Sequence, residues 1–207
     1  MGCGLSATGI FLAAFVWSAA SDPSFVPFES YISDLGVGPQ ASVINAAMVT
    51  AGLLTVPFAV LGFLPAMRRS VPAVLATAFL CLVGAFAVLA GLFTEGTPEW
   101  HSNASIGVFV SMAGTAVFAW LALRIGHPLG RWFTELTEVI AILGAFLVPM
   151  VGHPFIETLV MLVAFTWLPL LAVARLRQLI AGPVAAAQAA HPPEGSGPLP
   201  LPIETAK

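Results

Sequence analysis

AVLATAFLCLVGAFAVLAGLF, at residues 73–93, contains no charged side chain. An α-helix needs about 20 predominantly apolar residues to cross the hydrocarbon core of a bilayer, so this stretch predicts a membrane-spanning helix. Further runs of the same character lie at residues 4–20, 41–64, 104–124, 133–151 and 155–174. The sequence therefore predicts an all-α integral membrane bundle of about six transmembrane helices.

The composition of the whole chain also indicates that lipid surrounds most of the protein. Of its 207 residues, 58% are hydrophobic and 8% are charged, whereas soluble domains carry about a quarter charged residues. The formal net charge is -3 at pH 7, and nucleic-acid binding requires clustered cations. We therefore expect a multi-pass protein of the cell membrane whose partners are lipids or a hydrophobic small molecule, and not nucleic acid.

The distribution of basic residues predicts how the bundle is oriented. They follow the second, fourth and sixth runs or end the chain, at Arg68, Arg69, Arg124, Arg131, Arg175, Arg177 and Lys207. With six spans all of them lie on one side, and cytoplasmic loops are the ones enriched in Lys and Arg. Both termini are then cytoplasmic. Residues 1–180 form the predicted transmembrane domain, and residues 181–207, rich in Ala, Pro and Gly, form a predicted disordered cytoplasmic tail.

The opposite, extracytoplasmic side collects acids and histidines. These residues are Asp22, Glu29, Asp34, Glu95, Glu99, His101, His153 and Glu157. One interpretation is topological, since the positive-inside bias removes Lys and Arg from outer loops and leaves the acids behind. The other interpretation is a site at the outer membrane–water boundary.

Three residues are the preferred catalytic members of such a site: Asp34, His101 and His153. Each lies at a predicted helix boundary, where rigid elements can direct it into the top of the bundle. A low dielectric there raises the pKa of a carboxyl group and lets it donate a proton. The residues predicted to contact a substrate are Ser33, Asn45, Glu99 and Glu157.

Structural alternatives exist for several of these residues. Pro154 fits the first turn of a helix, and Glu157 in that turn complements the helix dipole. Asn45 can satisfy its amide by bonding between helices. Near the cytoplasmic side, Glu135 is spaced to pair with a basic residue four positions earlier. Glu138 lies deeper in the predicted span, where an acid is either functional or reaches with its side chain to the membrane–water interface.

The segment Tyr31–Gly36 reads YISDLG, and Asn45 and Gly52 follow it in the next predicted span. With His101 beginning the fourth span, this pattern resembles a bacterial and archaeal six-span family catalogued as domain of unknown function nine-nine-eight. That family is similar in turn to the Frag1/DRAM/Sfk1 proteins, which are associated with lipid organisation and membrane regulation. The resemblance implies no established activity. It singles out Ser33, Asp34, Asn45 and His101.

Three functions follow as hypotheses. The first is a membrane protein that binds a lipid or isoprenoid amphiphile in an extracytoplasmic pocket. The second is a membrane enzyme, an acid–base cyclase or a hydrolase, in which Asp34 acts with His101 or His153. A transporter is least favoured, because transporters place ionisable groups near the bilayer midplane and often contain repeats. No cofactor is predicted, although two histidines and carboxylates also suit a divalent metal such as zinc.

Overall fold

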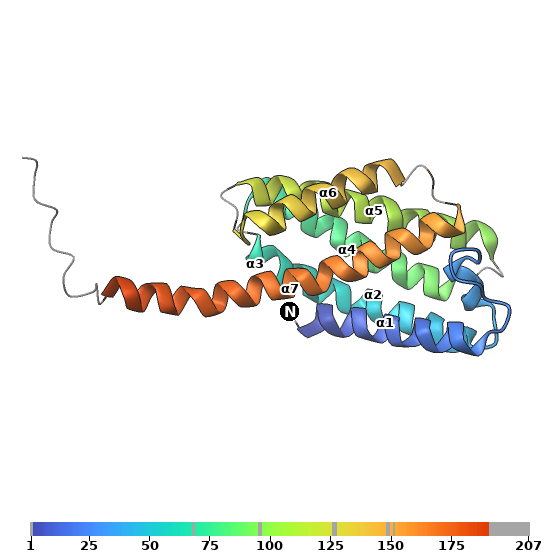
Figure 1. The fold of residues 1–207 in the computed structure, drawn as a ribbon. Coiled ribbons are helices and arrows are strands. Elements are labelled where there is room, and N and C mark those ends of the chain that lie inside the picture. The colour runs from blue at the N-terminus through green and yellow to red at the C-terminus, as the bar shows by residue number, and fades with distance from the viewer. Residues whose placement is uncertain are drawn as a thin grey trace, which may run out of the picture.

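A computed structural model of the chain describes residues 2–67, 69–94, 97–125, 128–147, 150 and 152–190, with the backbone alone for residues 178–190. The elements in chain order are α1 (Gly2–Ser21), the 3-10 helix η1 (Ile32–Gly36), α2 (Ala41–Phe58), the π-helix η2 (Ala59–Phe63), α3 (Leu64–Ala66), α4 (Val71–Leu92), α5 (Pro98–Arg124), α6 (Arg131–Leu147) and α7 (Pro154–Ala190). Figure 1 shows the long helices aligned side by side in one bundle. The predicted all-α fold is confirmed.

Five of the helices have the length and the apolar composition that crossing a membrane requires. They are α1, the continuous rod Ala41–Ala66, α4, α5 and α7 up to Arg177. The exception within the described part of the chain is α6, which has 17 residues and is therefore about 26 Å long at 1.5 Å per residue. Its first two turns also carry Arg131, Glu135 and Glu138. The predicted run at 133–151 is a helix of the bundle, but it lacks the features of a full span.

The second rod contains a π-helical turn between two prolines. Pro57 lies inside α2 and Pro65 lies in the first turn of α3. The N–H of Leu64 bonds to the carbonyl of Ala59, five residues back. Proline lacks the N–H that the helix ladder needs and clashes with the preceding turn. The wider π spacing between the two prolines keeps the rod helical while it accommodates them.

Glycines allow α2 and α4 to approach each other closely. A Cβ built on Gly52 would lie 2.6 Å from the carbonyl oxygen of Gly84, and one on Gly84 would lie 2.7 Å from that of Gly52. Small residues allow transmembrane helices to pack backbone to backbone. On α5, Gly107 and Gly114 likewise lie against Phe86 and Phe79 of α4. The small-residue faces of these helices are therefore packing surfaces.

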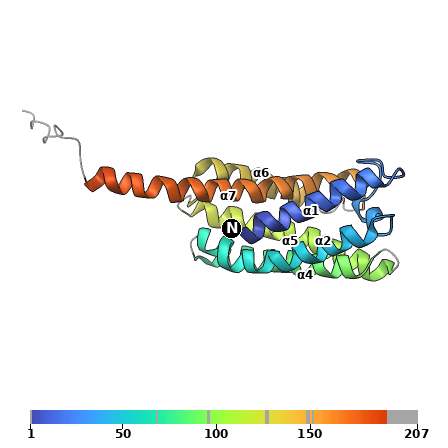
Figure 2. The ribbon, with the colours of Figure 1, turned by 90° about the horizontal axis from the view of Figure 1, so that it is seen from below.

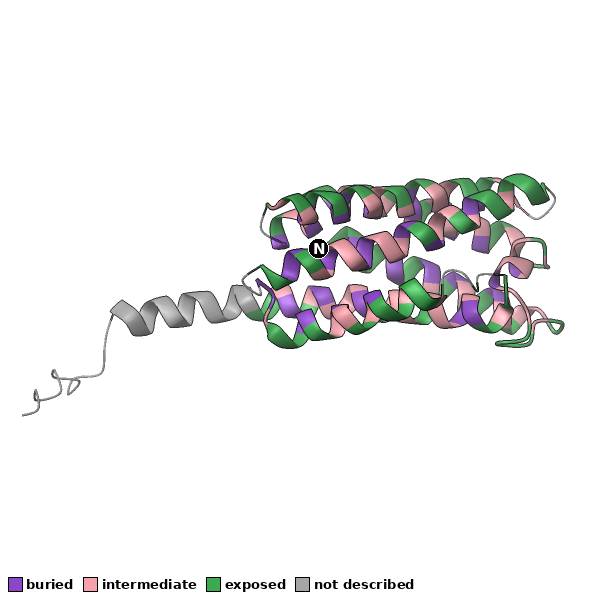
Figure 3. Ribbon diagram, turned by 90° about the horizontal axis from the view of Figure 1, so that it is seen from above, coloured by how far each residue is buried: buried purple, intermediate pink, exposed green. Residues whose placement is uncertain are grey.

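The outward faces of the helices are apolar, as a lipid solvent requires. Leu61, Val71 and Phe146 are 77%, 75% and 74% exposed. Figure 3 shows buried residues turned towards the bundle axis and exposed residues turned outward on each helix. The pattern of a soluble protein, with polar residues outside, is absent from the described helix faces between their ends.

Connections alternate between the two ends of the bundle. Residues 22–40, the start of α5 and the start of α7 gather at one end, whereas the start of α1 lies at the other, as Figures 1 and 2 show. We call the first the acidic end, defined by residues 22–40, 97–101 and 152–157. The second, the basic end, holds the described basic residues Arg69, Arg124, Arg131, Arg175 and Arg177.

The last helix is longer than the predicted sixth run. That run was expected at residues 155–174, with a domain boundary at residue 180, and α7 continues through both to Ala190. The remainder of the predicted tail, residues 191–207, lies outside the described residues, as do Arg68, Glu95 and Lys207.

Candidate ligand-binding site

The YISDLG segment folds into a fixed corner at the acidic end. Oδ2 of Asp34 accepts a hydrogen bond from the backbone N–H of Tyr31, 2.9 Å away, and so caps the 3-10 turn. The hydroxyl of Tyr31 donates to the carbonyl of Gly152, just before α7. Ile32 and Leu35 are buried and anchor the corner to the bundle. Asp34 therefore has a local structural role, in the way that short polar side chains cap turns.

A small pocket with several polar side chains in an otherwise apolar lining lies beside this corner, with a volume of about 50 Å³. We call it the head pocket. Segments far apart in the sequence form it: η1, α2, the end of α4, α5 and α7. Its polar lining residues are Ser33, Asn45, Thr94, His101, Ser105 and Glu157. Four of the predicted site residues, Ser33, Asn45, His101 and Glu157, thus converge on one pocket.

His101 is held in one orientation within this pocket. Its Nδ1 lies 2.7 Å from the carbonyl oxygen of Phe93. A carbonyl oxygen only accepts hydrogen bonds, so Nδ1 carries a proton in this geometry. Nε2 lies 3.4 Å from the hydroxyl oxygen of Ser105, one helical turn further along α5. Contacts at both ring nitrogens therefore fix how the ring faces the pocket.

Asn45 is oriented by the same logic. Its Nδ2 donates to the carbonyl of Gly36, 2.9 Å away, so Oδ1 is an acceptor. This bond joins α2 to the corner rather than to another long helix. Asn45 thus fixes η1 through this bond, and it also lines the head pocket, where a contact with substrate was predicted.

The other predicted site residues lie outside the head pocket. Asp34 is directed to the backbone of Tyr31. Glu99 and His153 are exposed on the surface of the acidic end. Two polar lining residues, Thr94 and Ser105, were not predicted. The position of Ser105 four residues after His101 places both on one helix face, whereas no sequence pattern marks Thr94.

A larger apolar cavity of about 160 Å³ lies deeper in the bundle, and we call it the tail cavity. All six long helices contribute to its walls, which include Trp167 and Gly144. Four residues line both spaces, which are therefore neighbours: Met48, Val108, Phe109 and Met161. A dry apolar cavity of about 150 Å³ accepts a guest the size of benzene, so the tail cavity matches a chain segment of about six carbon atoms.

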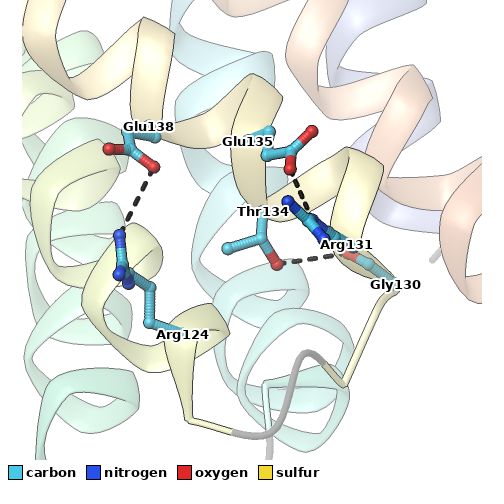
Figure 4. Close-up of polar contacts among 6 residues, drawn as sticks. All are labelled: Arg124, Gly130, Arg131, Thr134, Glu135 and Glu138. Atoms are coloured by element: carbon cyan, nitrogen blue, oxygen red, sulfur yellow. Dashed lines mark hydrogen bonds and ion pairs between the residues drawn. The ribbon is translucent and has the colours of Figure 1, made fainter.

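Near the basic end, the charges of α6 are paired. Nε of Arg131 bonds to Oε1 of Glu135 at 2.7 Å, as predicted from their spacing. Arg124 of α5 and Glu138 of α6 form an ion pair at 3.6 Å, shown in Figure 4. Exposed pairs of this kind contribute about 0–1 kcal/mol. The ion pair gives Glu138 a structural partner on a neighbouring helix.

Asp22, directly after α1, has a lowered pKa. The hydroxyl and the backbone N–H of Ser24 both donate to its Oδ1, at 2.6 and 2.9 Å. These bonds favour the charged form and lower the pKa of Asp22.

Within the described residues, no group of three or more His, Cys, Asp or Glu side chains is placed to hold a metal ion.

Comparison with known proteins identifies a family but no function. No curated protein and no solved structure matches the chain. A family model described as "protein of unknown function (DUF998)" matches residues 5–174, which include α2, α4, α5 and α6, most of α1, the first half of α7 and the head pocket. Because this match covers more than half of the chain, the protein belongs to the DUF998 family of multi-span membrane proteins.

Proposed function

We propose that this protein binds a single-chain lipid or isoprenoid amphiphile, with its polar head in the head pocket and its apolar chain in the tail cavity. The observation that carries the proposal is the shared wall of the two spaces at Met48, Val108, Phe109 and Met161. Ligand pockets typically combine a largely apolar lining with a few oriented polar groups. His101 and Asn45 supply such groups here.

The proposal includes an orientation in the cell membrane. The five described arginines lie at the basic end, which the positive-inside rule assigns to the cytoplasm. The head pocket then lies near the extracytoplasmic surface, within reach of amphiphiles in the outer leaflet. Cysteine labelling of Arg69→Cys and Glu99→Cys from opposite sides of the membrane tests this arrangement, and reaction of both from one side would contradict it.

Filling the tail cavity tests the binding function. Gly144 lines the cavity, and a Cβ on it would meet nothing closer than Ala113 at 3.8 Å. Gly144→Leu therefore places a side chain into the cavity without a backbone clash. Gly9→Leu is the matched control, because a Cβ at Gly9 has no neighbour within 4 Å and the residue is exposed on α1.

The readout is native mass spectrometry of the full chain with dodecyl amphiphiles of different head groups. We expect the wild type and Gly9→Leu to retain one molecule of at least one amphiphile per chain, and Gly144→Leu to lose it while remaining folded by circular dichroism. If the wild type retains none of them, or if Gly144→Leu retains the same one equally well, the binding proposal is wrong.

A membrane enzyme acting on a lipid is the second candidate, and the geometry of His101 favours it. An oriented Nε2 acceptor beside the hydroxyl of Ser105 is suited to general-base chemistry. Asp34, the predicted acid, lies outside the head pocket and is engaged by the Tyr31 backbone. Chemical turnover of a bound lipid that His101→Gln abolishes would support catalysis, whereas recovery of the lipid unchanged would count against it.

A further inference from the structure

We propose that Ser105 is the nucleophile of an acyl-transfer site in the head pocket, with His101 as its general base. The substrate class that this assignment implies is an uncharged acyl ester. The inference rests on the proposed binding function, because the acyl chain of the ester occupies the tail cavity, and it adds a reaction to that function. The nucleophile is a residue that the sequence did not single out.

The hydroxyl of Ser105 and the ring of His101 form a hydrogen-bonded pair. Oγ of Ser105 lies 3.4 Å from Nε2 of His101, and Nδ1 of the same ring lies 2.7 Å from the carbonyl oxygen of Phe93. In the neutral ring the proton on Nδ1 leaves Nε2 as the acceptor, so the Ser105 hydroxyl donates to it. A nucleophile beside a base that a third group orients is how enzymes activate serine, and the hydrogen bond between them is often longer before substrate binds.

One face of α5 connects this pair to the tail cavity. His101, Ser105 and Phe109 follow one another at intervals of four residues, so they lie on the same side of the helix. His101 and Ser105 line the head pocket, Phe109 lines both spaces, and Met112 lines the tail cavity. Ser105 and Phe109 are about 6 Å apart along the helix axis, at 1.5 Å per residue. A chain held in the tail cavity therefore brings an ester carbonyl at its end beside Oγ of Ser105.

The reaction that this arrangement supports has two balanced steps. Oγ of Ser105 attacks the carbonyl carbon of the ester while Nε2 of His101 takes the hydroxyl proton. The ester C–O bond then breaks, and the alcohol leaves with that proton. Water attacks the acyl group on Ser105 and gives a proton to Nε2, which returns it to Oγ as the carboxylic acid is released.

The head pocket also contains donors for the charge that develops on the carbonyl oxygen. The hydroxyl groups of Ser33 and Thr94 lie among its lining residues. Neutral donors fixed in such a site stabilise an oxyanion in the transition state. The lining thus combines a nucleophile, a base and hydroxyl donors in one small space.

The test uses β-lactones that carry a methyl or a hexyl chain on the carbon beside the carbonyl. An activated serine opens the ring: Oγ is acylated, the C–O bond of the ring breaks, and the ring oxygen takes the proton from Nε2. The adduct therefore retains every atom of the probe. Each lactone is added to the full wild-type chain in detergent, and intact-protein and peptide mass spectrometry measure the rate and the position of acylation.

We expect one adduct per chain, at Ser105. The hexyl lactone should react at least about tenfold faster than the methyl lactone, because the longer chain buries more apolar surface in the tail cavity. Gly144→Leu places a side chain in that cavity and should remove the preference for the hexyl lactone. Gly9→Leu, on the exposed face of α1, should retain it.

Matched variants test the two residues that carry the inference. Ser105→Ala should abolish the adduct, whereas Ser102→Ala, at an exposed serine of the same helix, leaves the rate unchanged. His101→Gln should slow acylation about a hundredfold or more, as loss of a general base does, whereas His153→Gln, at an exposed histidine, does not. Size-exclusion profiles and thermal midpoints establish that each variant is folded, and the position of the adduct in the wild type requires no variant.

The outcomes separate this inference from the function on which it rests. If the wild type forms no adduct at Ser105, or forms one only elsewhere, such as at the exposed Cys3, the assignment of the nucleophile is overturned. Equal acylation rates in His101→Gln and the wild type would also overturn the inference. Retention of dodecyl amphiphiles by a wild type without the adduct would leave the proposed function standing. Acylation of Ser105 at equal rates by both lactones, without retention of any amphiphile, would support the nucleophile and contradict the proposed function.

Discussion

Alanine at Gly84 is expected to destabilise the bundle, because the new methyl group meets backbone rather than a movable side chain. Its Cβ would lie 2.7 Å from the carbonyl oxygen of Gly52 and 3.2 Å from a methyl group of Val56. An ordinary contact begins near 3.4 Å, so α2 and α4 must separate by about 0.7 Å, a shift that forfeits a quarter to a half of the dispersion energy between them.

The magnitude follows from two opposing terms. Overpacking of a close contact costs about 1–3 kcal/mol, whereas alanine in place of glycine inside a helix gains about 0.8–1.0 kcal/mol. Gly9→Ala on α1 receives the same gain with no neighbour within 4 Å. The difference between the two variants therefore isolates the packing term of about 1–3 kcal/mol, because the helix-propensity terms cancel.

Thermal unfolding of both variants in the same detergent, followed by circular dichroism, measures this difference. For a chain of this size, 1 kcal/mol corresponds to about 2–4 °C in the midpoint, so Gly84→Ala should melt roughly 2–12 °C below Gly9→Ala. A midpoint for Gly84→Ala equal to or above that of Gly9→Ala would refute the close backbone contact between α2 and α4.

Three further predictions address other parts of the molecule. Nε1 of Trp167 donates to Oγ1 of the buried Thr137, at 3.1 Å, so Thr137→Val should lower the free energy of unfolding by about 1–3 kcal/mol through an unsatisfied indole N–H. Thr137→Ser keeps the hydroxyl and should therefore retain most of the wild-type stability. Equal losses of unfolding free energy for the two variants in chemical denaturation would contradict this prediction. Asp34→Ala should cost about 0.5–2 kcal/mol through loss of the cap, and retained amphiphile binding by this variant would distinguish a structural role from a catalytic one. The Ser24 bonds lower the pKa of Asp22 below 3.8, so their stabilising contribution is present above the unfolded value and is lost as the pH falls through the lower folded value. Ser24→Ala removes the hydroxyl bond and should raise the pKa of Asp22 measured by NMR titration. An unchanged pKa would show that the hydroxyl bond does not form.

The helices were largely predictable from hydropathy, but their ends were not. The run at 73–93 corresponds to α4, Val71–Leu92, with small errors at both ends. The run at 104–124 began too late, because α5 starts at Pro98 and includes polar residues before it reaches the apolar stretch. Hydropathy locates the part of a helix that lies in hydrocarbon, whereas backbone hydrogen bonding continues into the polar boundary, where a proline in the first turn favours the start of a helix.

The site was predicted at the level of a region and only in part at the level of residues. Because successive spans run in opposite directions, the sequence predicted that the acids and histidines of alternate loops would gather at one end of the bundle. Which side chains enter the pocket depends on helix rotation, since neighbours two positions apart, such as Glu99 and His101, face different directions. His101 lines the head pocket and Glu99 is exposed. The tail cavity depends on packing among six helices, which no local pattern encodes.

The YISDLG corner positions the site more than it contacts a ligand. Asp34 closes the 3-10 turn, and the carbonyl of Gly36 fixes Asn45 of α2. The hydroxyl of Tyr31 holds the carbonyl of Gly152, five residues before Glu157 of α7. One short segment thereby sets the positions of two helices that supply head-pocket acceptors. Rigid support of this kind is what an oriented polar site requires, so the most recognisable stretch of the sequence explains where the pocket lies.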